Sequence, residues 1–566
     1  MAASIGERQQ ALCRRVPRWT PRTLDQMLDA AAAEFPDRPY VVTDERQYSY
    51  NDIKAWSERL AQGLAEAGIQ RGDHVAVVLA NYPAFVALKF AISRAGAVCV
   101  PINFLNRRDE LGFVLKQSDA KLLITMDRFR NLDYQKALDE LAPGWEAKGG
   151  GEAFPALKRI IVFPTSDAAV SQGAATFSDL EGSARAWHPV PGANPAATSD
   201  IIFTSGTTGS PKGVMLTHDM LLRAACASAY ARAFGDGWSI LFSLPMYHVY
   251  GYVEGMLSVL FVGGAIVPQL QFDPVSTLGA IGRHRATDVL LVPTMTMALL
   301  EELKHRSYDL SSLVAIISSG QRSPIAIWDE IRERFGPVEL TTGYGMTEVT
   351  ATTTATRPDD PLERLRTTNG RMRDAGPAGD PRLGGRLVEY RVVDPETGRS
   401  LPPGEVGELM ARGPGVTAGY YKRPDATAEA FDAEGWLHTG DLGRFDPDGY
   451  LTLVGRRKES YRCGGEQVTP TEVEDVLVSH PAVLQAHVVP VPDKRMGEAG
   501  AAYVVLRPDY PVSSQELIDL CAERLARFKV PKYVLPIRAD ELPVTPSGRA
   551  RKFLLSQRAV AELNLQ

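Results

Sequence analysis

Residues 201–215, IIFTSGTTGSPKGVM, carry an apolar run straight into a loop of glycines, hydroxyl side chains and one lysine. The apolar run predicts a buried strand. Gly206 and Gly209 let backbone N–H groups turn towards an anion, and Lys212 adds a positive charge. Hydroxyl donors are supplied by Thr204, Ser205, Thr207 and Thr208. The stretch therefore predicts a phosphate-binding loop, but not of the Walker type, because Pro211 stands where that motif has its second glycine.

Apolar runs alternate with helical patterns on both sides of this loop. Residues 74–79 and 98–102 predict strands, with a helix over residues 82–95 between them. Further short buried strands are predicted at residues 239–244, 265–268, 289–292 and 313–318. Such alternation is typical of an α/β fold with largely parallel strands. We therefore expect a large N-terminal domain, residues 1–454, that contains two α/β subdomains.

The pattern changes in the last third of the chain. Residues 384–453 contain short alternating segments separated by turn dipeptides, which predicts a small β-barrel-like subdomain of antiparallel strands. A small α+β domain is expected over residues 460–566, with helices at 470–479 and 514–527 and strands at 486–490 and 501–506. Residues 455–459 form the predicted hinge, and the Gly464–Gly465 pair beside it favours rotation of a mobile C-terminal domain.

Composition excludes several classes of protein. The 566 residues carry a net charge of -6 without a Lys/Arg block, so nucleic acid is a poor partner. Five scattered cysteines argue against a disulfide framework or zinc site and favour a cytoplasmic location. No secretory leader is expected, and the longest apolar stretch, residues 256–270, is shorter than the ~20 residues of a membrane span. We expect that stretch to be buried core, and a homodimer is compatible with the sequence.

Three further motifs carry groups suited to a nucleotide. In TGYGMTE, residues 342–348, the Tyr344 ring can stack on a base, and a hydroxyl followed by a carboxylate can bind a phosphate oxygen and its Mg²⁺. Asp441 has only acceptor oxygens, which suit the two hydroxyls of a ribose. His248, in LPMYHVYG at residues 244–251, is either a functional group or a packed core histidine, and the local sequence favours neither.

The segment TSGTTGSPKG, residues 204–213, resembles the phosphate loop of the AMP-binding, adenylate-forming superfamily. That superfamily includes acyl-CoA synthetases, 4-coumarate ligases, firefly luciferase and peptide-synthetase adenylation domains. The other motifs resemble the family's in the expected order: LPMYHVYG, TGYGMTE, GDL at residues 440–442 and GRRKE at residues 455–459. SSGQR, residues 318–322, occupies the place of the adenine wall, although Gln321 and Arg322 depart from the usual pattern.

The resemblance implies a role for each matching position. Tyr344 would cover the adenine, Thr347 would touch the α-phosphate and Glu348 would hold Mg²⁺. Asp441 would accept both ribose hydroxyls, and Arg456 would reach the same nucleotide. The rest of the implied nucleotide site is Gly320, Gln321, Gly343, Gly345 and Met346. The implied acyl pocket is formed by Tyr247, His248, Val249, Tyr252, Val349 and Thr350. Lys458 is the implied hinge residue, and the implied CoA tunnel is bordered by Gly464, Gly465 and Glu466.

The terminal motif departs from the family. Residues 543–549 read PVTPSGR, so Arg549 stands where the family has a lysine that reaches the α-phosphate and the carboxylate. A planar guanidinium does not simply replace a compact ammonium, so adenylation is expected to be slowed or lost. Lys552 lies three residues further on and is expected to be solvated rather than to take over that role. The implied catalytic set is therefore Arg549, Lys212, Glu348 and His248.

These observations predict a Mg²⁺-dependent enzyme that activates a carboxylic acid with ATP and transfers the acyl group to coenzyme A. An apolar pocket around Tyr247 and Val249 would suit an aryl, alicyclic or medium-to-long aliphatic acid. One alternative is an enzyme of one half-reaction, as the Arg549 departure would permit. Others are a non-catalytic nucleotide- or acyl-binding protein, a luciferase-like oxygenase, and an adenylation domain that loads a carrier protein.

Overall fold

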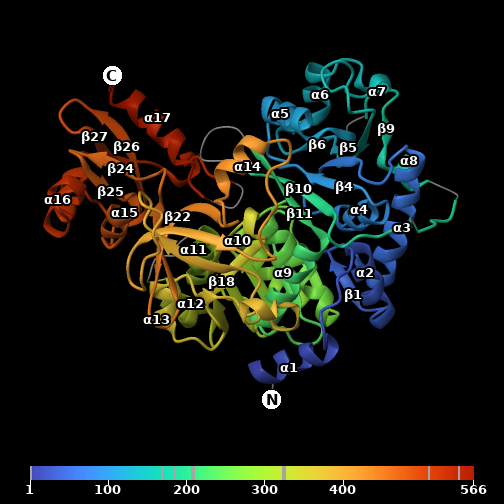
Figure 1. The fold of residues 1–566 in the computed structure, drawn as a ribbon, viewed down its shortest axis with the longest axis horizontal. Helices are drawn as coiled ribbons and strands as arrows, with labels where there is room; N and C mark the ends of the chain where they lie inside the picture. Colours follow the sequence, from blue (N-terminus) through green and yellow to red (C-terminus); the bar gives the residue numbers. More distant parts are fainter. Residues whose placement is uncertain are drawn as a thin grey trace.

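The computed structural model describes residues 3–166, 170–182, 185–189, 191–204, 211–320, 327–507, 510–545 and 549–565. Figure 1 shows a large body that contains the N-terminal elements and a smaller lobe, orange to red at the upper left, that carries α15, α16 and α17. The expected α/β fold with a small α+β C-terminal domain is confirmed. No helix in the described part of the chain is long and apolar enough to cross a membrane.

One seven-stranded sheet has the spatial order β11-β10-β4-β3-β5-β8-β9. Its strands are β3 (His74–Val78), β4 (Val98–Pro101), β5 (Ala120–Met126), β8 (Arg159–Phe163), β9 (Ala175–Thr176), β10 (Thr198–Thr204) and β11 (Lys212–Thr217). Only β10 and β11 pair antiparallel; the other neighbours are parallel. Helix α4 (Pro83–Arg94) packs on α3 (Tyr50–Glu66) and is buried from its second residue onwards. The strands and the helix predicted at residues 74–102 are confirmed.

A second seven-stranded sheet has the order β16-β15-β14-β12-β13-β1-β2. Its strands are β1 (Pro39–Val42), β2 (Gln47–Ser49), β12 (Ser239–Phe242), β13 (Ala265–Pro268), β14 (Asp288–Leu291), β15 (Ala315–Ser318) and β16 (Glu339–Thr341). The four strands predicted between residues 239 and 318 are β12 to β15. Strand β1 comes from far upstream and pairs in parallel with β13, so the two α/β subdomains are not contiguous in sequence.

The remaining helices of the large body cover these sheets and connect their strands. They are α1 (Ile5–Arg15), α2 (Leu24–Glu34), α5 (Arg108–Ser118), α6 (Tyr134–Leu141), α7 (Trp145–Lys148), α8 (Phe177–Glu181), α9 (His218–Ala231), α10 (Pro274–His284), α11 (Pro293–His305), α12 (Ile327–Phe335), α13 (Leu362–Thr367) and α14 (Pro424–Ala430). A short ladder joins β6 (Arg128–Phe129) to β7 (Leu132–Asp133). The stretch expected to be core, residues 256–270, begins at the end of a buried π-helical turn, Tyr250–Leu257, and continues through the 3-10 turn Ser258–Val262 into β13. It is largely buried as expected, but Leu270 at its end is exposed.

Antiparallel strands follow the second sheet, as predicted. A three-stranded sheet contains β17 (Gly343–Met346), β18 (Ala351–Ala355) and β19 (Arg371–Met372). A four-stranded sheet contains β20 (Glu389–Val393), β21 (Gly407–Arg412), β22 (Leu437–Phe445) and β23 (Leu451–Arg456) in that order. A barrel of these four strands requires β20 and β23 to pair with each other, whereas β23 bonds to the chain beside β19, where the Leu451 N–H donates to the Gly370 carbonyl at 2.7 Å. The predicted antiparallel strands are therefore present as two sheets linked through β23, without direct closure between β20 and β23.

The smaller lobe has a sheet of the order β25-β24-β27-β26, with β28 paired to β27. Its elements are β24 (Tyr461–Cys463), β25 (Glu466–Val468), α15 (Pro470–Val478), β26 (Val483–Asp493), β27 (Gly497–Leu506), α16 (Ser514–Arg524), β28 (Tyr533–Pro536) and α17 (Lys552–Glu562). The predicted helices and strands are present, but β26 and β27 form a longer hairpin than expected. Two apolar clusters lie in this lobe, one including Val488 and Leu517, the other Val489 and Leu555.

Candidate active site

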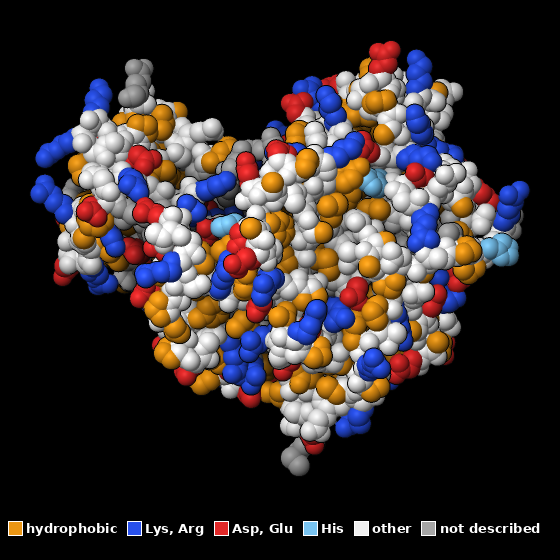
Figure 2. All heavy atoms as spheres, in the orientation of Figure 1, with side chains coloured by type: hydrophobic (Ala, Val, Ile, Leu, Met, Phe, Trp, Pro, Cys, Tyr) orange, Lys and Arg blue, Asp and Glu red, His pale blue; other side chains and the backbone are white. Residues whose placement is uncertain are grey.

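The cleft between the two lobes contains a cavity of 2440 Å³. Figure 2 shows the molecule hollowed at the top, between the lobe at the upper left and the body at the right. The cavity is lined from one side by the ends of β10 and β11, by β17 and by the turn before the π-helix. Residues around Arg549 in the smaller lobe line the other side. Motifs far apart in the sequence therefore meet at one cavity.

The β10–β11 hairpin brings both ends of the predicted phosphate loop to this cavity. Thr204, the last residue of β10, pairs with Lys212, the first residue of β11, and both line the cavity. The Lys212 Nζ lies 4.8 Å from the ring centroid of Tyr420, which orients the ammonium without neutralising it. The intervening positions Ser205, Gly206, Thr207, Thr208 and Gly209 lie outside the described residues.

A buried polar cluster joins three strands at the cavity wall. Asp441 on β22 is paired in register with Arg456 on β23, whose Nε donates to Asp441 Oδ1 at 2.7 Å. The Tyr344 hydroxyl, on β17, donates to Asp441 Oδ2 at 2.7 Å. Burial and the neighbouring carboxylate raise the pKa of Tyr344, so the phenol stays a neutral donor. Each Asp441 oxygen keeps a free lone pair for a further hydroxyl donor.

Glu348 lies beside this cluster in the 3-10 turn Thr347–Val349. Its side chain is buried, and the Tyr420 hydroxyl donates to Oε1 at 3.1 Å. Burial raises the pKa of Glu348, because the carboxylate has lost much of its water, and a cation beside it would restore the stabilisation of its charge. The described residues contain no cluster of three or more metal-ligating side chains. A single carboxylate together with substrate phosphates is a usual way to hold Mg²⁺, so Glu348 fits that ion.

Most of the other expected nucleotide positions also line the cavity. These are Gly320, Gly343, Gly345, Met346 and Thr347, whereas Gln321 lies outside the described residues. A Cβ on Gly345 would lie 1.7 Å from the carbonyl oxygen of Ala351, so only glycine fits at the irregularity where β17 pairs with β18. Packing between the two strands is therefore sufficient to explain glycine at this position.

Arg549 reaches the cavity from the smaller lobe. Its Nη2 donates to Glu459 Oε1 at 3.1 Å, and the side chain remains 37% exposed. Lys552, expected to be solvated, is instead only 14% exposed: its Nζ lies 2.7 Å from Glu474 Oε1 and 3.4 Å from Glu459 Oε2. The expectation for Lys552 was wrong, because two carboxylates from the turn after β23 and from α15 compensate its partial burial. Arg549 and Lys552 thus share Glu459 as an anionic partner.

The segment that precedes the π-helix forms another part of the wall. Tyr247, His248, Val249 and Tyr250 line the cavity. Burial lowers the pKa of His248 to about 4, and its Nδ1 accepts from the Tyr250 N–H at 3.2 Å, so the ring is neutral at physiological pH. The two alternatives for His248 are therefore compatible: the ring is packed and also faces the cavity.

Other expected site residues lie elsewhere. Tyr252, Val349 and Thr350 are buried and do not line the cavity; the ring of Tyr252 packs over Lys89 Nζ at 4.6 Å. Gly464 and Gly465 have positive φ and form the tight turn of the β24–β25 hairpin, in which Cys463 pairs with Glu466. Gly464, Gly465 and Glu466 are exposed and also do not line the cavity, whereas Lys458 lies in an exposed turn at its rim.

Two residues that contact the site, Tyr420 and Glu459, were not predicted from the sequence. Tyr420 lies against both Lys212 and Glu348, and Glu459 binds the terminal motif. The run GYYKRP, residues 419–424, marks Tyr420 only as a turn aromatic, because nothing in the local sequence predicts a partner some 70 residues upstream. Glu459 was included in the hinge motif without a role of its own.

Comparison with known proteins agrees with this arrangement. The AMP-binding enzyme family matches residues 28–421, and the AMP-binding enzyme C-terminal domain matches residues 472–549. A putative acyl-CoA synthetase, YngI of Bacillus subtilis, is 36% identical over 561 residues, covering 96% of this chain and 98% of that protein. The medium-chain fatty-acid–CoA ligase of Escherichia coli is 33% identical over 564 residues, covering 98% and 93%.

Among solved structures, the o-succinylbenzoate coenzyme A synthetase of Bacillus subtilis in complex with ATP and a magnesium ion superposes with a TM-score of 0.76. The two chains are 28% identical, and the match covers 94% of this chain and 98% of that one. The similarity therefore extends over both lobes and the cleft between them.

Proposed function

The chain belongs to the superfamily of AMP-binding, adenylate-forming enzymes as an acid–thiol ligase of the acyl-CoA synthetase type, and on that premise we propose that it activates a hydrophobic carboxylic acid. The acid would become an acyl-AMP in the cavity between the lobes and then pass to coenzyme A. The observation that carries this proposal is the buried Tyr344–Asp441–Arg456 cluster, which opens on the same cavity as Lys212 and Glu348.

In the first step, a carboxylate oxygen of the acid would attack the α-phosphorus of ATP, and pyrophosphate would leave. Lys212 and Arg549 supply positive charge where two anions must meet, and Asp441 would hold the ribose. Bound Mg²⁺, held by Glu348, would neutralise phosphate charge. The neutral His248 ring adds no charge beside the acyl group. The protein thus positions and neutralises, without a nucleophile of its own.

In the second step, the thiol sulfur of coenzyme A would attack the acyl carbon, its proton would be lost, and AMP would leave. For this step we propose that the smaller lobe rotates about residues 455–459 with Lys458 as the hinge residue. Lys458 is exposed in a turn, where a change of backbone dihedrals disturbs little packing. The rotation would bring Gly464, Gly465 and Glu466, which lie away from the cavity in this conformation, towards the coenzyme.

Arg549 supports a specific second candidate. Its guanidinium is bound by Glu459, so it has to exchange that carboxylate for the anions of the substrates. A slow exchange would leave an enzyme that thioesterifies a supplied acyl-adenylate but makes little of its own. Because the second step would use another face of the smaller lobe, Arg549 would affect the first step alone.

The proposed acid class rests on the wall formed by Tyr247, His248 and Val249. The Tyr247 ring meets Phe104 edge to face at 5.3 Å, which extends an aromatic surface from the cavity wall. An apolar wall of this kind favours an aryl, alicyclic or medium-to-long aliphatic acid. The E. coli relative, by its name, acts on medium-chain fatty acids, so these acids form the core of the test panel.

The test is mass spectrometry of the products formed from ATP, Mg²⁺ and a panel of carboxylic acids, with and without coenzyme A. A full ligase yields acyl-AMP without coenzyme A and acyl-CoA with it. Acyl-CoA formed only from synthetic acyl-AMPs would support the half-reaction enzyme. If neither the carboxylic acids nor the synthetic acyl-AMPs yield product while ATP still binds, the protein is a nucleotide-binding protein. The Asp441→Asn variant is the control for products of contaminating enzymes.

A further inference from the structure

The segment that follows Glu348 has a strained backbone. Thr350 and Ala351 are both in the left-handed region, with φ of 57° and 74°. This conformation is unfavourable for any residue with a Cβ, and most of all for a β-branched one. Such strain persists only where the surroundings hold it, and it concentrates at functional sites. Thr350 links the turn that carries Glu348 to β18, which begins at Ala351, so the conformation of these two residues sets where Glu348 lies.

The Thr350 N–H closes the 3-10 turn by donating to the Thr347 carbonyl at 3.1 Å, and three further contacts among the described residues hold the strained positions. The Thr350 hydroxyl donates to the Gly415 carbonyl at 2.8 Å, and the Ala351 carbonyl packs against Gly345, where no Cβ would fit. The third contact is the N–H of Thr352, which donates at 3.1 Å to Oε1 of Glu254. Only this third contact is made by an ionised side chain from outside the strands, and Glu254 lies almost 100 residues upstream.

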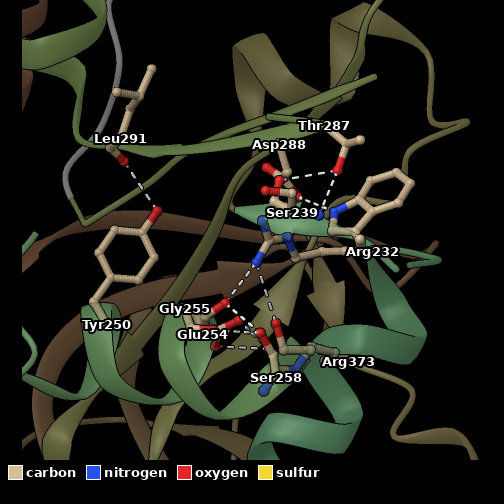
Figure 3. Close-up of polar contacts among 12 residues, drawn as sticks. Arg232, Ser239, Tyr250, Glu254, Gly255, Ser258, Thr287, Asp288, Leu291 and Arg373 are labelled. Atoms are coloured by element: carbon tan, nitrogen blue, oxygen red, sulfur yellow. Dashed lines mark hydrogen bonds and ion pairs between the residues drawn. The ribbon is translucent and has the colours of Figure 1, made fainter. Parts of the chain in front are cut away.

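Glu254 is itself fixed in place. It is fully buried in the π-helical turn Tyr250–Leu257, and Nη1 of Arg373 donates to its two oxygens at 2.9 and 3.1 Å. Burial is the largest influence and opposes ionisation, but Arg373, the Ser228 side chain and Arg232 together outweigh it and hold the pKa of Glu254 below its ordinary value. Arg232 donates to the backbone oxygen of Glu254 at 3.0 Å and also pairs with Asp288 (Figure 3). The carboxylate is therefore an acceptor with little freedom to move.

The same π-helical turn begins at the cavity wall. Tyr250 lines the cavity, and its hydroxyl donates to the Leu291 carbonyl at 3.1 Å, as Figure 3 shows. π-Helical turns are rare and are frequently found at functional sites. A buried ion pair is weak grounds for a role in stability alone, since well-packed apolar residues often replace such pairs without loss. The pair of Glu254 and Arg373 therefore calls for another explanation.

We propose that Glu254 is a positioning residue for the nucleotide site. Its carboxylate holds the Thr352 N–H, keeps Thr350 and Ala351 in their left-handed conformation, and so fixes Glu348 where it meets the metal–nucleotide complex. This inference rests on the proposed function, because it assumes that Glu348 serves Mg²⁺ and ATP. Because Tyr250 and Glu254 belong to the same π-helical turn, this turn would fix both the cavity wall at Tyr250 and the position of Glu348.

Two double variants isolate the hydrogen bond to Thr352. Glu254→Gln with Arg373→Met removes the buried charges and keeps an acceptor, whereas Glu254→Met with Arg373→Met removes the acceptor as well. Both lose the bond from Arg373 to the Ala224 carbonyl, and Gln and Met have similar shapes. Calorimetric titration with Mg²⁺–ATP, well below the thermal midpoint of each variant, is expected to show about tenfold weaker binding without the acceptor. Tighter Mg²⁺–ATP binding by the double variant with Glu254→Gln than by the one with Glu254→Met is a result that a merely structural role would not produce.

The outcomes separate the two proposals. If the wild-type protein does not bind Mg²⁺–ATP, the proposed function fails. If the wild type binds and the two folded variants bind equally well, Glu254 does not position the site and this inference is overturned. Should the methionine pair not fold, Thr350→Gly replaces it: glycine accepts the positive φ but removes the bond to Gly415. That variant is expected to bind Mg²⁺–ATP about threefold more weakly or worse at an unchanged midpoint, and unchanged affinity would overturn the inference.

Discussion

Asp441→Asn is the most informative single change in the proposed nucleotide site. The carboxylate is 5% exposed and accepts from Arg456 Nε and the Tyr344 hydroxyl, both at 2.7 Å. Asparagine has the same shape, but one of its two positions becomes a donor. The amide nitrogen must face either Arg456 or Tyr344, and only one oxygen remains for the two hydroxyls of a ribose.

The size of the effect follows from this geometry. A hydrogen bond to a charged group contributes about 1.5–3 kcal/mol, and asparagine removes one such acceptor and the charge behind the other. About 1.4 kcal/mol corresponds to a factor of ten, so ATP affinity is expected to fall by about 10- to 100-fold. The free energy of unfolding should fall by about 1–3 kcal/mol, because one partner of the carboxylate is left unpaired. The loss is no larger because the Arg456 side chain, which is 23% exposed, keeps some access to water.

The assay is calorimetric titration of ATP with Mg²⁺, combined with thermal unfolding of the free protein. Asp446→Asn is the matched control, since Asp446 also accepts from an arginine, Arg364, at 2.7 Å but does not line the cavity. The control should bind ATP as the wild type does. An Asp441→Asn protein that is folded and binds ATP within twofold of the wild type would refute the assignment of this cluster to the nucleotide.

Two further predictions use other parts of the structure. Arg549→Lys is expected to raise acid-dependent pyrophosphate release severalfold, because an ammonium fits between two anions more readily than a guanidinium. Acyl-CoA formation from supplied acyl-AMP should stay nearly constant in the same variant. A fall in both rates would show that the site is tuned for arginine. Burial lowers the pKa of His218 to about 4, against about 6.5 in the unfolded chain, so the unfolded state binds a proton more readily than the folded state. The free energy of unfolding that this neutral histidine contributes above pH 6.5 is therefore lost as the pH falls towards 4, and the loss is about 2 kcal/mol at pH 5. Chemical denaturation at pH 7.5 and pH 5 should therefore show a smaller acid loss in His218→Gln, and an equal loss in both proteins would contradict this account.

Much of the fold was predictable because its elements leave local patterns. The β3–α4–β4 unit and the strands β12 to β15 are short apolar runs between helical patterns, which periodicity identifies. The pairing of β1 with β13 was not predictable, since nothing in residues 39–42 specifies a partner more than 200 residues away. The π-helical turn was also missed: its eight residues are all buried, so they show no amphipathic period.

The site divides in the same way. Lys212, Tyr344, Glu348 and Asp441 lie in motifs with distinctive composition, and the structure brings all four to one cavity. Lys552 was misjudged because its exposure is decided by Glu459 and Glu474, which only the folded chain brings to it. The link from Glu254 to Thr352 has no sequence pattern at all, because it joins a buried side chain of the π-helical turn to a backbone N–H in β18.

The central claim is that this chain forms an acyl-AMP in the cavity between its lobes. The most direct measurement is the exchange of labelled pyrophosphate into ATP, with Mg²⁺ and a panel of hydrophobic acids but no coenzyme A, since label enters ATP only when the first step runs in reverse. The account predicts exchange that depends on the acid and is reduced at least tenfold in Asp441→Asn. Exchange that ignores the acid, or that survives unchanged in that variant, would contradict it.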